Sequence, residues 1–335
     1  MPDRFDEKYD IRLAEYGEIE EVMAFIDTHW RRGHILAADR DFFEYEMVVD
    51  GRVDFLIAKR HDSGTIDGVL GFLPCSHDPE KLDIWGVIWM TIPGAEPMLG
   101  IQLKKRLMNI IGARCDLGVG ANPKTSVPLL SRLCHYYTAK MKHYYRLADR
   151  DEYRIASVKD KIIPDFLLSE ASVVRIGNIS ELEGYYDSDY MENCIPYKDL
   201  WYYKRRFFDH PIYHYDVWGI DCGGRRAFMV TRIQECNSST AVRIVDYAGE
   251  QSLFGMIGGF LDSLLKDNEY VDFYFDGFDE QYAKQAGMVS IDDADNIIPN
   301  YFSPYVCENV DIYVDSSNRE AKCLFFKADC DQDRP

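Results

Sequence analysis

The chain has no Cys-x-x-Cys pair, no long apolar run and far fewer basic than acidic residues. Its nine Cys are an odd number at scattered spacings, which argues against a disulfide framework and favours a reducing cytoplasm. Without Cys-x-x-Cys pairs we expect no structural zinc site. No apolar run approaches the roughly 18 residues that span a membrane, and the polar, acidic start is unlike a signal peptide. We therefore expect a cytoplasmic protein without a metal.

The charge balance excludes one class of partner. The chain carries 38 Lys and Arg against 57 Asp and Glu, for a net charge of −19. Such a surface repels nucleic acid and anionic membranes, so neither is expected as a partner. Apolar residues make up 47% of the 335 residues, with 23 Tyr and 18 Phe, which is typical of a globular chain long enough for two domains.

Two ten-residue segments, 11–20 and 174–183, are nearly alike. Arg12 and Arg175 correspond, as do Glu18 and Glu181, and the apolar positions exchange like for like. Each segment predicts a short strand, a turn and the start of a helix. The chain is therefore expected to hold two copies of one unit, whose differences indicate how the work is divided.

Beyond each of these segments the chain repeats the same order of strands and helices. In the first half we expect strands at 9–15, 53–59, 66–74, 84–91, 115–120 and 136–145, and helices at 18–28, 40–48, 98–112 and 123–134. In the second half we expect strands at 173–178, 215–221, 227–235, 241–247 and 271–276, and helices at 197–208, 253–266 and 279–285. The pattern predicts an α/β (α+β) protein of two domains, 1–150 and 161–335.

The junction after the fourth strand differs between the halves. In the first half a Gly-containing loop leads into a helix with Gly100 near its start and the basic triplet 104–106 one turn later. Helix N-termini suit anions because their first N–H groups lack internal partners and carry partial positive charge. In the second half Glu250 stands at this place and no basic triplet comes after it. Only the first copy is therefore expected to bind an anionic ligand.

This order of elements, with this junction, resembles the GNAT acyltransferases. In that family the loop grips the pyrophosphate of coenzyme A at a helix N-terminus; Gly100 fits the family motif, whereas Glu96 and Gln102 depart from it. The resemblance implies two tandem GNAT-like domains, each a mixed, mostly antiparallel sheet flanked by helices, and acyl-CoA as the acyl donor. It implies donor contacts from Met90, Ile92, Met98, Leu99, Gly100, Ile101, Lys104, Asn122, Lys124 and Thr125.

Four stretches, 135–137, 141–146, 243–247 and 326–335, resemble a narrower branch, the tandem-GNAT sugar N-acyltransferases of bacterial surface-polysaccharide (lipopolysaccharide or capsule) biosynthesis. That resemblance implies a dTDP-linked 3-amino-3,6-dideoxyhexose as acceptor and a hydroxybutyryl group, such as 3-hydroxybutyryl, as the acyl chain. It is compatible with a homodimer. The implied acceptor contacts are Trp85, His143, Asp246, Tyr247 and Arg334.

Direct transfer to an amine needs a base and donors for the oxyanion, and the leaving thiolate can take a proton from an acid. Backbone N–H groups near Met90 are the expected oxyanion donors. Candidates for the base are Asp83 and His135, with His77, Glu96 and His143 left open, and candidates for the acid are Tyr136 and Tyr137. A ping-pong route through Cys75, Cys115 or Cys134 is a further alternative, although Cys115 and Cys134 lie in apolar runs typical of a core.

Two other functions fit the same sequence. An acyltransferase that acts on a carrier protein or a peptide would share the fold and the donor. A non-catalytic binding protein built from two degenerate copies would explain the departures at Glu96 and Gln102.

Overall fold

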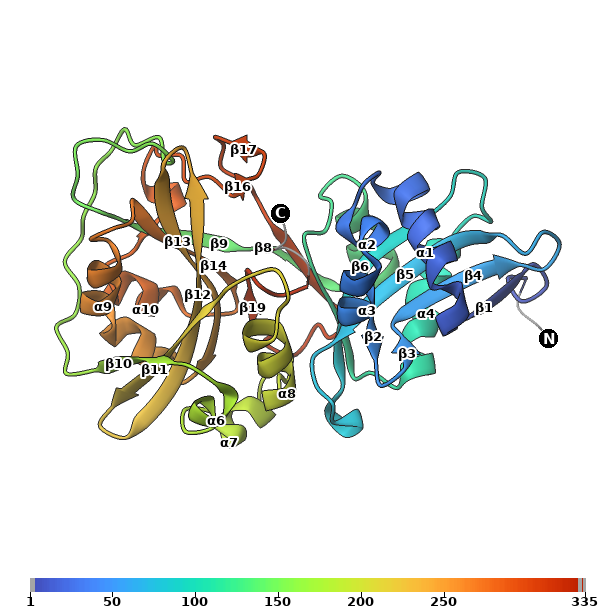
Figure 1. The fold of residues 1–335 in the computed structure, drawn as a ribbon, viewed down its shortest axis with the longest axis horizontal. Coiled ribbons are helices and arrows are strands. Elements are labelled where there is room, and N and C mark those ends of the chain that lie inside the picture. Colours follow the sequence, from blue (N-terminus) through green and yellow to red (C-terminus); the bar gives the residue numbers. More distant parts are fainter. Residues whose placement is uncertain (1–3, 331–332, 334–335) are drawn as a thin grey trace. The chain divides into compact units, whose positions relative to one another are not determined.

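The computed structural model describes residues 4–330 and 333. It divides into two compact units, Met1–Gly118 and Val119–Pro335, called here the first and the second unit (Figure 1). The division lies at an earlier position in the chain than the boundary that was expected after residue 150. Strand β9 (Lys142–Leu147) belongs to the second unit because it pairs along its length with β14 (Tyr270–Asp276).

The first unit is a sheet with helices on both faces. Its sheet has the order β1-β4-β5-β6-β7, antiparallel except for the parallel pair β6–β7. The strands are β1 (Tyr9–Leu13), β4 (Phe55–Arg60), β5 (Ile66–Pro74), β6 (Asp83–Thr91) and β7 (Cys115–Val119), with the small hairpin β2 (Val48–Val49) and β3 (Arg52–Val53). The helices are α1 (Ile19–Phe25), α2 (Ile35–Ala38), α3 (Arg40–Met47) and α4 (Leu99–Ile111).

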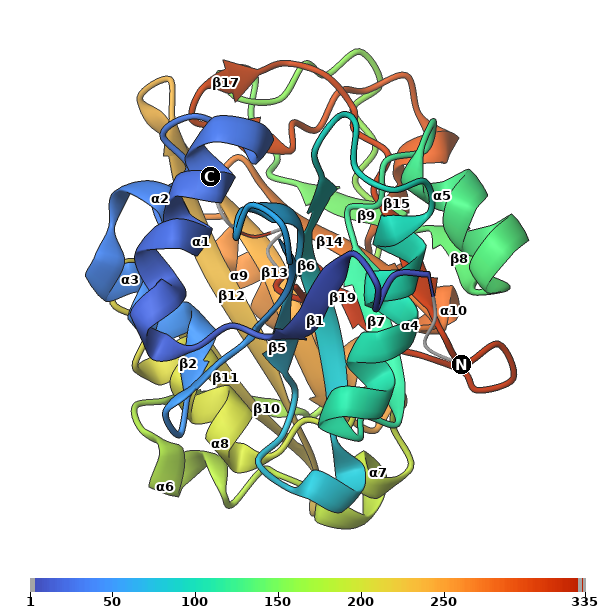
Figure 2. The same cartoon turned by 90° about the vertical axis from the view of Figure 1, so that its right-hand side faces the viewer.

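Alternation along the strands separates the two faces of this sheet. Leu56 and Leu70 pack with Leu99, Leu103 and Leu107 of α4 in one buried cluster, and α4 lies along this face (Figure 2). On the other face Phe55 stacks on Phe43 of α3, with ring centroids 5.6 Å apart. The sheet is therefore buried on both sides, and its open features lie at strand ends and edges.

The second unit has a sheet of order β10-β11-β12-β13-β14-β9-β15, in which β13–β14 is parallel and β19 pairs with β14. The strands are β10 (Ser172–Ile176), β11 (Asp216–Cys222), β12 (Arg225–Cys236), β13 (Ser239–Gly249), β15 (Val289–Ser290) and β19 (Phe325–Phe326), besides β9 and β14. Further pairs are β8 (Tyr137–Lys140) with β18 (Tyr313–Ser316), and β16 (Tyr301–Phe302) with β17 (Tyr305–Val306). The helices are α5 (Ser126–Leu129), α6 (Ile179–Leu182), α7 (Ser188–Glu192), α8 (Leu200–Tyr203), α9 (Gly258–Leu264) and α10 (Glu280–Gln285).

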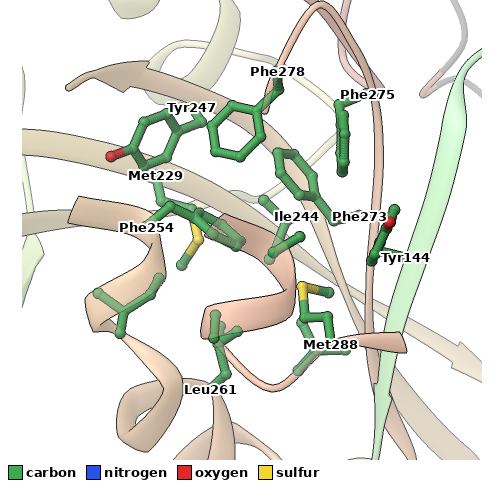
Figure 3. Close-up of a cluster of buried hydrophobic side chains, with 14 of the residues drawn as sticks. Tyr144, Met229, Ile244, Tyr247, Phe254, Leu261, Phe273, Phe275, Phe278 and Met288 are labelled. Carbon is green, nitrogen blue, oxygen red and sulfur yellow. The ribbon is translucent and has the colours of Figure 1, made fainter. Parts of the chain in front are cut away.

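An aromatic cluster forms the core of the second unit. Phe254, Phe273 and Phe278 lie with ring centroids 5.0 to 5.4 Å apart, packed with Tyr247 and Phe275 (Figure 3). Offset and edge-on contacts at these distances favour a specific packing beyond simple burial. These rings come from β13, β14 and the segments directly after them, so they hold the centre of the sheet.

Most expected elements are present, with two differences. The helix expected at 253–266 is divided into a 3₁₀ segment, Gln251–Met256, and α9, in a stretch that contains Gly255, Gly258 and Gly259. Glycine disfavours a continuous helix because it loses the most backbone freedom. The strand expected at 136–145 is two strands, β8 and β9, with different partners. Within residues 4–330 and 333, no helix has the length and apolarity needed to cross a membrane.

Candidate functional site

In the first unit β6 and β7 pair only at their beginnings. Their parallel register covers Asp83–Trp85 against Cys115–Leu117. Beyond Trp85, β6 stays paired with β5 but bulges, with Val87 and Ile88 opposite the single residue Gly71. A bulge bends its strand and re-aims the residues beyond it. The later part of β6 therefore has an edge that no residue of β7 covers within the described first unit.

The backbone along this edge presents hydrogen-bond donors. Ile92 donates its N–H to the carbonyl of Asp67, on the β5 side, at 2.9 Å. Because antiparallel neighbours alternate between bonded and non-bonded pairs, Met90 also faces β5, and Trp89 and Thr91 direct their N–H groups to the open edge. Of the backbone N–H groups near Met90, those of Trp89 and Thr91 therefore face the open edge.

Helix α4 begins beside the end of β6. Its N-cap Met98 is 47% exposed and has φ 72°. Leu99 donates its N–H to Glu96 at 3.1 Å and Gln102 donates to Met98 at 3.0 Å, whereas the N–H groups of Gly100 and Ile101 have no partner in the described part of the chain. Two free donors at the positive end of a 13-residue helix are an arrangement that suits an anion.

Gly100 has a second role that the motif does not indicate. The indole Nε1 of Trp89 donates to the carbonyl oxygen of Gly100 at 2.9 Å. A Cβ at position 100 would lie 3.1 Å from that nitrogen. The glycine therefore permits close packing of α4 on β6, and a substitution there would disturb Trp89 as well as any ligand.

The carboxylate of Glu96 is held away from the helix end. It forms ion pairs with Lys8 and, at 3.8 Å, with Arg4, and the hydrogen bond from Lys8 lowers the pKa of Glu96. Its own N–H donates to the phenol oxygen of Tyr9 at 3.1 Å. The residue that departs from the family motif is thus neutralised by the N-terminal segment, which also makes it a poor base.

The basic triplet is mostly engaged within the unit. Lys104 is buried and donates to both oxygens of Asp116, at 2.7 and 3.0 Å, so the prediction that it contacts a phosphate is wrong. Arg106 pairs with Asp6 at 2.6 Å. Lys105 alone is exposed. Helical spacing turned successive residues to different faces, which the triplet as a motif concealed.

The second unit repeats the divergence of its two central strands but fills the gap with its own chain. Strand β13 pairs with β14 over Val242–Ile244 and then bulges against β12. Beyond that point β19 pairs with β14, Phe326 opposite Phe275, and Ala328 donates its N–H to the carbonyl of Val245 in β13 at 2.8 Å. The C-terminal segment 325–329 thus bridges the diverging strands, and β19 is drawn beside β14 in Figure 1.

A buried cluster of charges holds this segment. Lys198 lies 2.8 Å from Asp246 and 2.6 Å from Asp329, and all three side chains are at most 4% exposed. Arg206 donates to the carbonyl of Ala328 at 3.2 Å. Asp246, Tyr247 and Arg334 were expected to contact the acceptor. That prediction is wrong for Asp246 and Tyr247, because both are enclosed in the unit, the latter 3% exposed; Arg334 lies outside the described residues.

We expect this cluster to make stability depend on pH. Burial raises the pKa of Asp329 to about 7, opposed by Lys198 and reinforced by Asp246. Since an unfolded Asp titrates near pH 4, the folded chain binds the extra proton between about pH 4 and 7, and stability falls as pH rises through that window, by up to about 1.4 kcal/mol per pH unit. Asp329→Asn, which stays neutral, should flatten this slope in urea unfolding at stepped pH. An unchanged slope would contradict the assignment.

Two residues at the start of β6 have structural partners. Asp83 is fully buried and receives two hydrogen bonds from Arg114, at 2.6 and 3.1 Å. Trp85 is also fully buried. A carboxylate clamped by a guanidinium at the closed end of the divergence is a poor base, and a buried indole cannot touch an acceptor. Neither expected role, base for Asp83 or acceptor contact for Trp85, is supported.

The residues expected near the last strand of the first half lie in the second unit. His135 is exposed with φ 58° at the end of the π-helical turn Leu130–Cys134, and Tyr136 is 9% exposed. Tyr137 is 37% exposed and its phenol donates to Asp276 at 2.9 Å. Burial, and then Asp276, raises the pKa of Tyr137 to about 12. Of the two tyrosines, Tyr137 is therefore the one that keeps an accessible proton at neutral pH.

His143 is a core residue rather than an acceptor contact. It is 5% exposed, stacks on Tyr274 at 3.8 Å and lies 3.2 Å from Asp272, which Arg243 also contacts at 2.8 Å. Burial lowers the pKa of this imidazole. Asp272 stands at the middle of the β13–β14 pairing, as Asp116 does in β6–β7. Both units thus neutralise an Asp at the point where their strands diverge.

The other residues expected to contact acyl-CoA are divided between the two units. Met90 and Ile92 are half-buried, and Leu99 and Ile101 are buried, all in the first unit. In the second unit the side-chain oxygen of Asn122 accepts from the N–H of Lys124 at 2.9 Å and of Thr125 at 3.3 Å, which is a turn of the Asx type. No group of three or more His, Cys, Asp or Glu in the described ranges could hold a metal ion.

Sequence reasoning did not find Trp89, Lys198 or Asp329. Each acts through a partner outside its own element: Trp89 through Gly100, Lys198 through Asp246 of β13, and Asp329 through Lys198. The only available signal was the resemblance of segment 326–335 to the narrower branch, which did not indicate that the segment lies inside a sheet.

Comparison with known proteins supports the fold. Neither a protein-family model nor a curated protein matches the chain. A GCN5-related N-acetyltransferase from Anabaena variabilis superposes with a TM-score of 0.57 at 9% identity, over 91% of this chain and 72% of that one. The glucosamine N-acetyltransferase region of a fungal multi-domain GH3 β-N-acetylglucosaminidase gives 0.50 at 12% identity, over 92% of this chain and 38% of that one. The chain therefore has the GNAT fold, in two tandem units.

Proposed function

We propose that the chain transfers an acyl group from acyl-CoA to a primary amine, with the donor bound by the first unit. The observation that carries this proposal is the open edge of β6 beside the free N-terminus of α4. The N–H groups of Gly100 and Ile101 would hold the pyrophosphate, and the pantetheine arm would run along the edge that β7 leaves uncovered.

The chemistry depends on the same edge. The neutral amine attacks the thioester carbonyl and a C–N bond forms. The C–S bond then breaks, and coenzyme A leaves as its thiolate. The amine's proton passes to solvent or to a base. The N–H groups of Trp89 and Thr91 would donate to the oxyanion, and removal of one such oxyanion donor costs roughly 3–4 kcal/mol in other acyl transfers.

Only one donor is proposed per chain. In the second unit the corresponding gap holds segment 325–329, and Glu250, paired with Arg225 at 2.8 Å, stands at the helix start. Isothermal titration with coenzyme A should give one site per chain. The unfolding temperature should rise with ligand, because coenzyme A at about 100 times its dissociation constant adds roughly 2.7 kcal/mol to the free energy of unfolding. Absence of any shift at millimolar ligand would favour the non-catalytic alternative.

For the acceptor we propose a dTDP-linked 3-amino-3,6-dideoxyhexose, with a 3-hydroxybutyryl donor, on the motif resemblance alone. The decisive assay incubates the protein with acetyl- or 3-hydroxybutyryl-CoA and either this nucleotide sugar or an amine-bearing carrier protein or peptide, and measures the product mass. N-acylated sugar supports the proposal. Acylated carrier protein or peptide instead would replace the acceptor while keeping the donor site.

A further inference from the structure

The second unit has an open groove that neither the proposed donor site nor the buried charge cluster uses. It has a volume of about 1,090 Å³ and lies among β10, α6, the segment before β11, and β12. Its lining includes apolar side chains, with Ile212 and Ile233 exposed by 40% and 49% and Phe208 half-buried. The lining also includes carboxylates, Glu181 and Glu235 among them, and Glu235 lies on the same face of β12 as Ile233.

The internal repeat shows how this place is closed in the first unit. There Arg12 forms a two-pronged ion pair with Glu18, at 2.7 and 3.0 Å, and Lys59 adds a second cation at 2.9 Å. These contacts lower the pKa of Glu18, the hydrogen bond from Arg12 contributing most. In the first unit the Glu18 carboxylate thus binds two cationic side chains, those of Arg12 and Lys59.

The second unit keeps the carboxylate but loses both cations. Glu181 corresponds to Glu18, but Arg175, the counterpart of Arg12, pairs with Asp216 instead. The strand registers align Lys59 with Ile220, which is apolar and fully buried. By the same registers Phe55 of the first unit corresponds to Asp216 of the second. The second unit therefore has a carboxylate, Asp216, that can pair with Arg175, where the first unit has an apolar ring.

Glu181 is left with neutral partners. Its oxygens accept from the N–H of Gly177 and the side-chain amide of Asn178, both at 2.7 Å, and no cation pairs with it among residues 4–330 and 333. Glu235 likewise has no ion pair there. The two arginines that line the groove are neutralised, Arg175 by Asp216 and Arg232 by Asp333 at 3.3 Å. The groove therefore carries uncompensated negative charge beside apolar side chains.

We propose that this groove binds a primary amine in its charged form, with the ammonium at Glu181 where the first unit places its own cations, and with an apolar face of the ligand against Ile212 and Ile233. Amino sugars belong to this class, since one face of a pyranose ring presents C–H groups. The inference rests on the proposed function only in taking this amine as the acyl acceptor. Binding of the amine to the groove does not require acyl-CoA.

The test measures amine binding without any acyl-CoA. Saturation-transfer NMR and titration compare D-glucosamine with N-acetyl-D-glucosamine, which has the same ring without the charge. The wild-type chain should bind the free amine about tenfold more tightly or better, because a hydrogen bond between two charged groups is roughly twice as strong as one between neutral groups. Equal binding of both sugars, or of neither, would overturn the proposal.

Two variants and a matched control make the site specific. Glu181→Gln keeps the hydrogen-bonding shape and should remove most of the preference for the amine. Glu18→Gln, the same change at the repeated position, should lower stability but leave amine binding unchanged. Asp216→Asn should free Arg175 to pair with Glu181, as Arg12 pairs with Glu18. This variant should therefore also bind the amine more weakly. Full amine binding by Glu181→Gln would refute the site.

The two proposals can fail separately. A variant disabled at the donor site should still bind the amine in this assay. Loss of amine binding with intact coenzyme A binding would reject the groove alone, whereas amine binding without coenzyme A binding would reject the donor site alone.

Discussion

Met98→Asp is expected to weaken coenzyme A binding by about tenfold or more, whereas Met98→Asn should stay within roughly twofold of the wild type. Met98 is the exposed N-cap of α4 and lies beside the free N–H groups of Gly100 and Ile101. Asp and Asn both tolerate its left-handed backbone, at φ 72°, better than most residues do. The two variants differ only in charge, so their difference isolates repulsion of the pyrophosphate.

Titration calorimetry of both variants with coenzyme A, alongside 3′-dephospho-coenzyme A, would measure this effect. The second ligand keeps the pyrophosphate and should show the same loss. Equal affinity of the Asp and Asn variants would mean that the pyrophosphate binds elsewhere. Position 98 is a cleaner probe than position 100, because a side chain at Gly100 would also press on Trp89.

Lys198→Met is expected to destabilise the second unit by about 3–5 kcal/mol at neutral pH. Removing the ammonium leaves Asp246 and Asp329 buried without their shared cation, 2.8 and 2.6 Å away in the wild type. On heating, this should appear as a fall in the unfolding temperature of roughly 10 °C. Amide exchange should also accelerate in β19, because the segment that fills the gap loses its anchor.

The loss should shrink at low pH, where both carboxylates take up protons and no longer need a cation. Lys204→Met is the matched control, since Lys204 lies nearby in sequence and its ion pair with Asp209 is half-exposed. Exposed pairs contribute at most about 1 kcal/mol. A loss of similar size in both variants would show that the buried cluster does not hold the C-terminal segment.

Much of the fold could be predicted because it depends on local patterns. The apolar spacing of α4, the run of β6 and the nearly repeated segments at Arg12 and Arg175 are all expressed in side-chain periodicity, which the chain displays directly. The free N–H groups at the start of α4 could also be predicted, since the first N–H groups of a helix lack partners within the helix.

The side-chain roles were less accessible. Lys104 and Lys105 are adjacent in sequence, but one is buried against Asp116 and the other is exposed. Asp83, Trp85, His143, Asp246 and Tyr247 carry residue types that suit chemistry, and the structure encloses all five. Residue type and spacing cannot distinguish a buried ion pair from a catalytic group, because both need the same side chains.

By itself, the sequence determined the repeat, the order of strands and helices, and the absence of a basic triplet in the second copy. Only the tertiary structure decided that segment 325–329 fills the gap of the second unit, that β9 pairs with β14, and that Glu181 loses the cations that Glu18 keeps. The first group depends on neighbours along the chain. The second depends on contacts between residues tens to more than a hundred positions apart, and those are formed only when the sheets assemble.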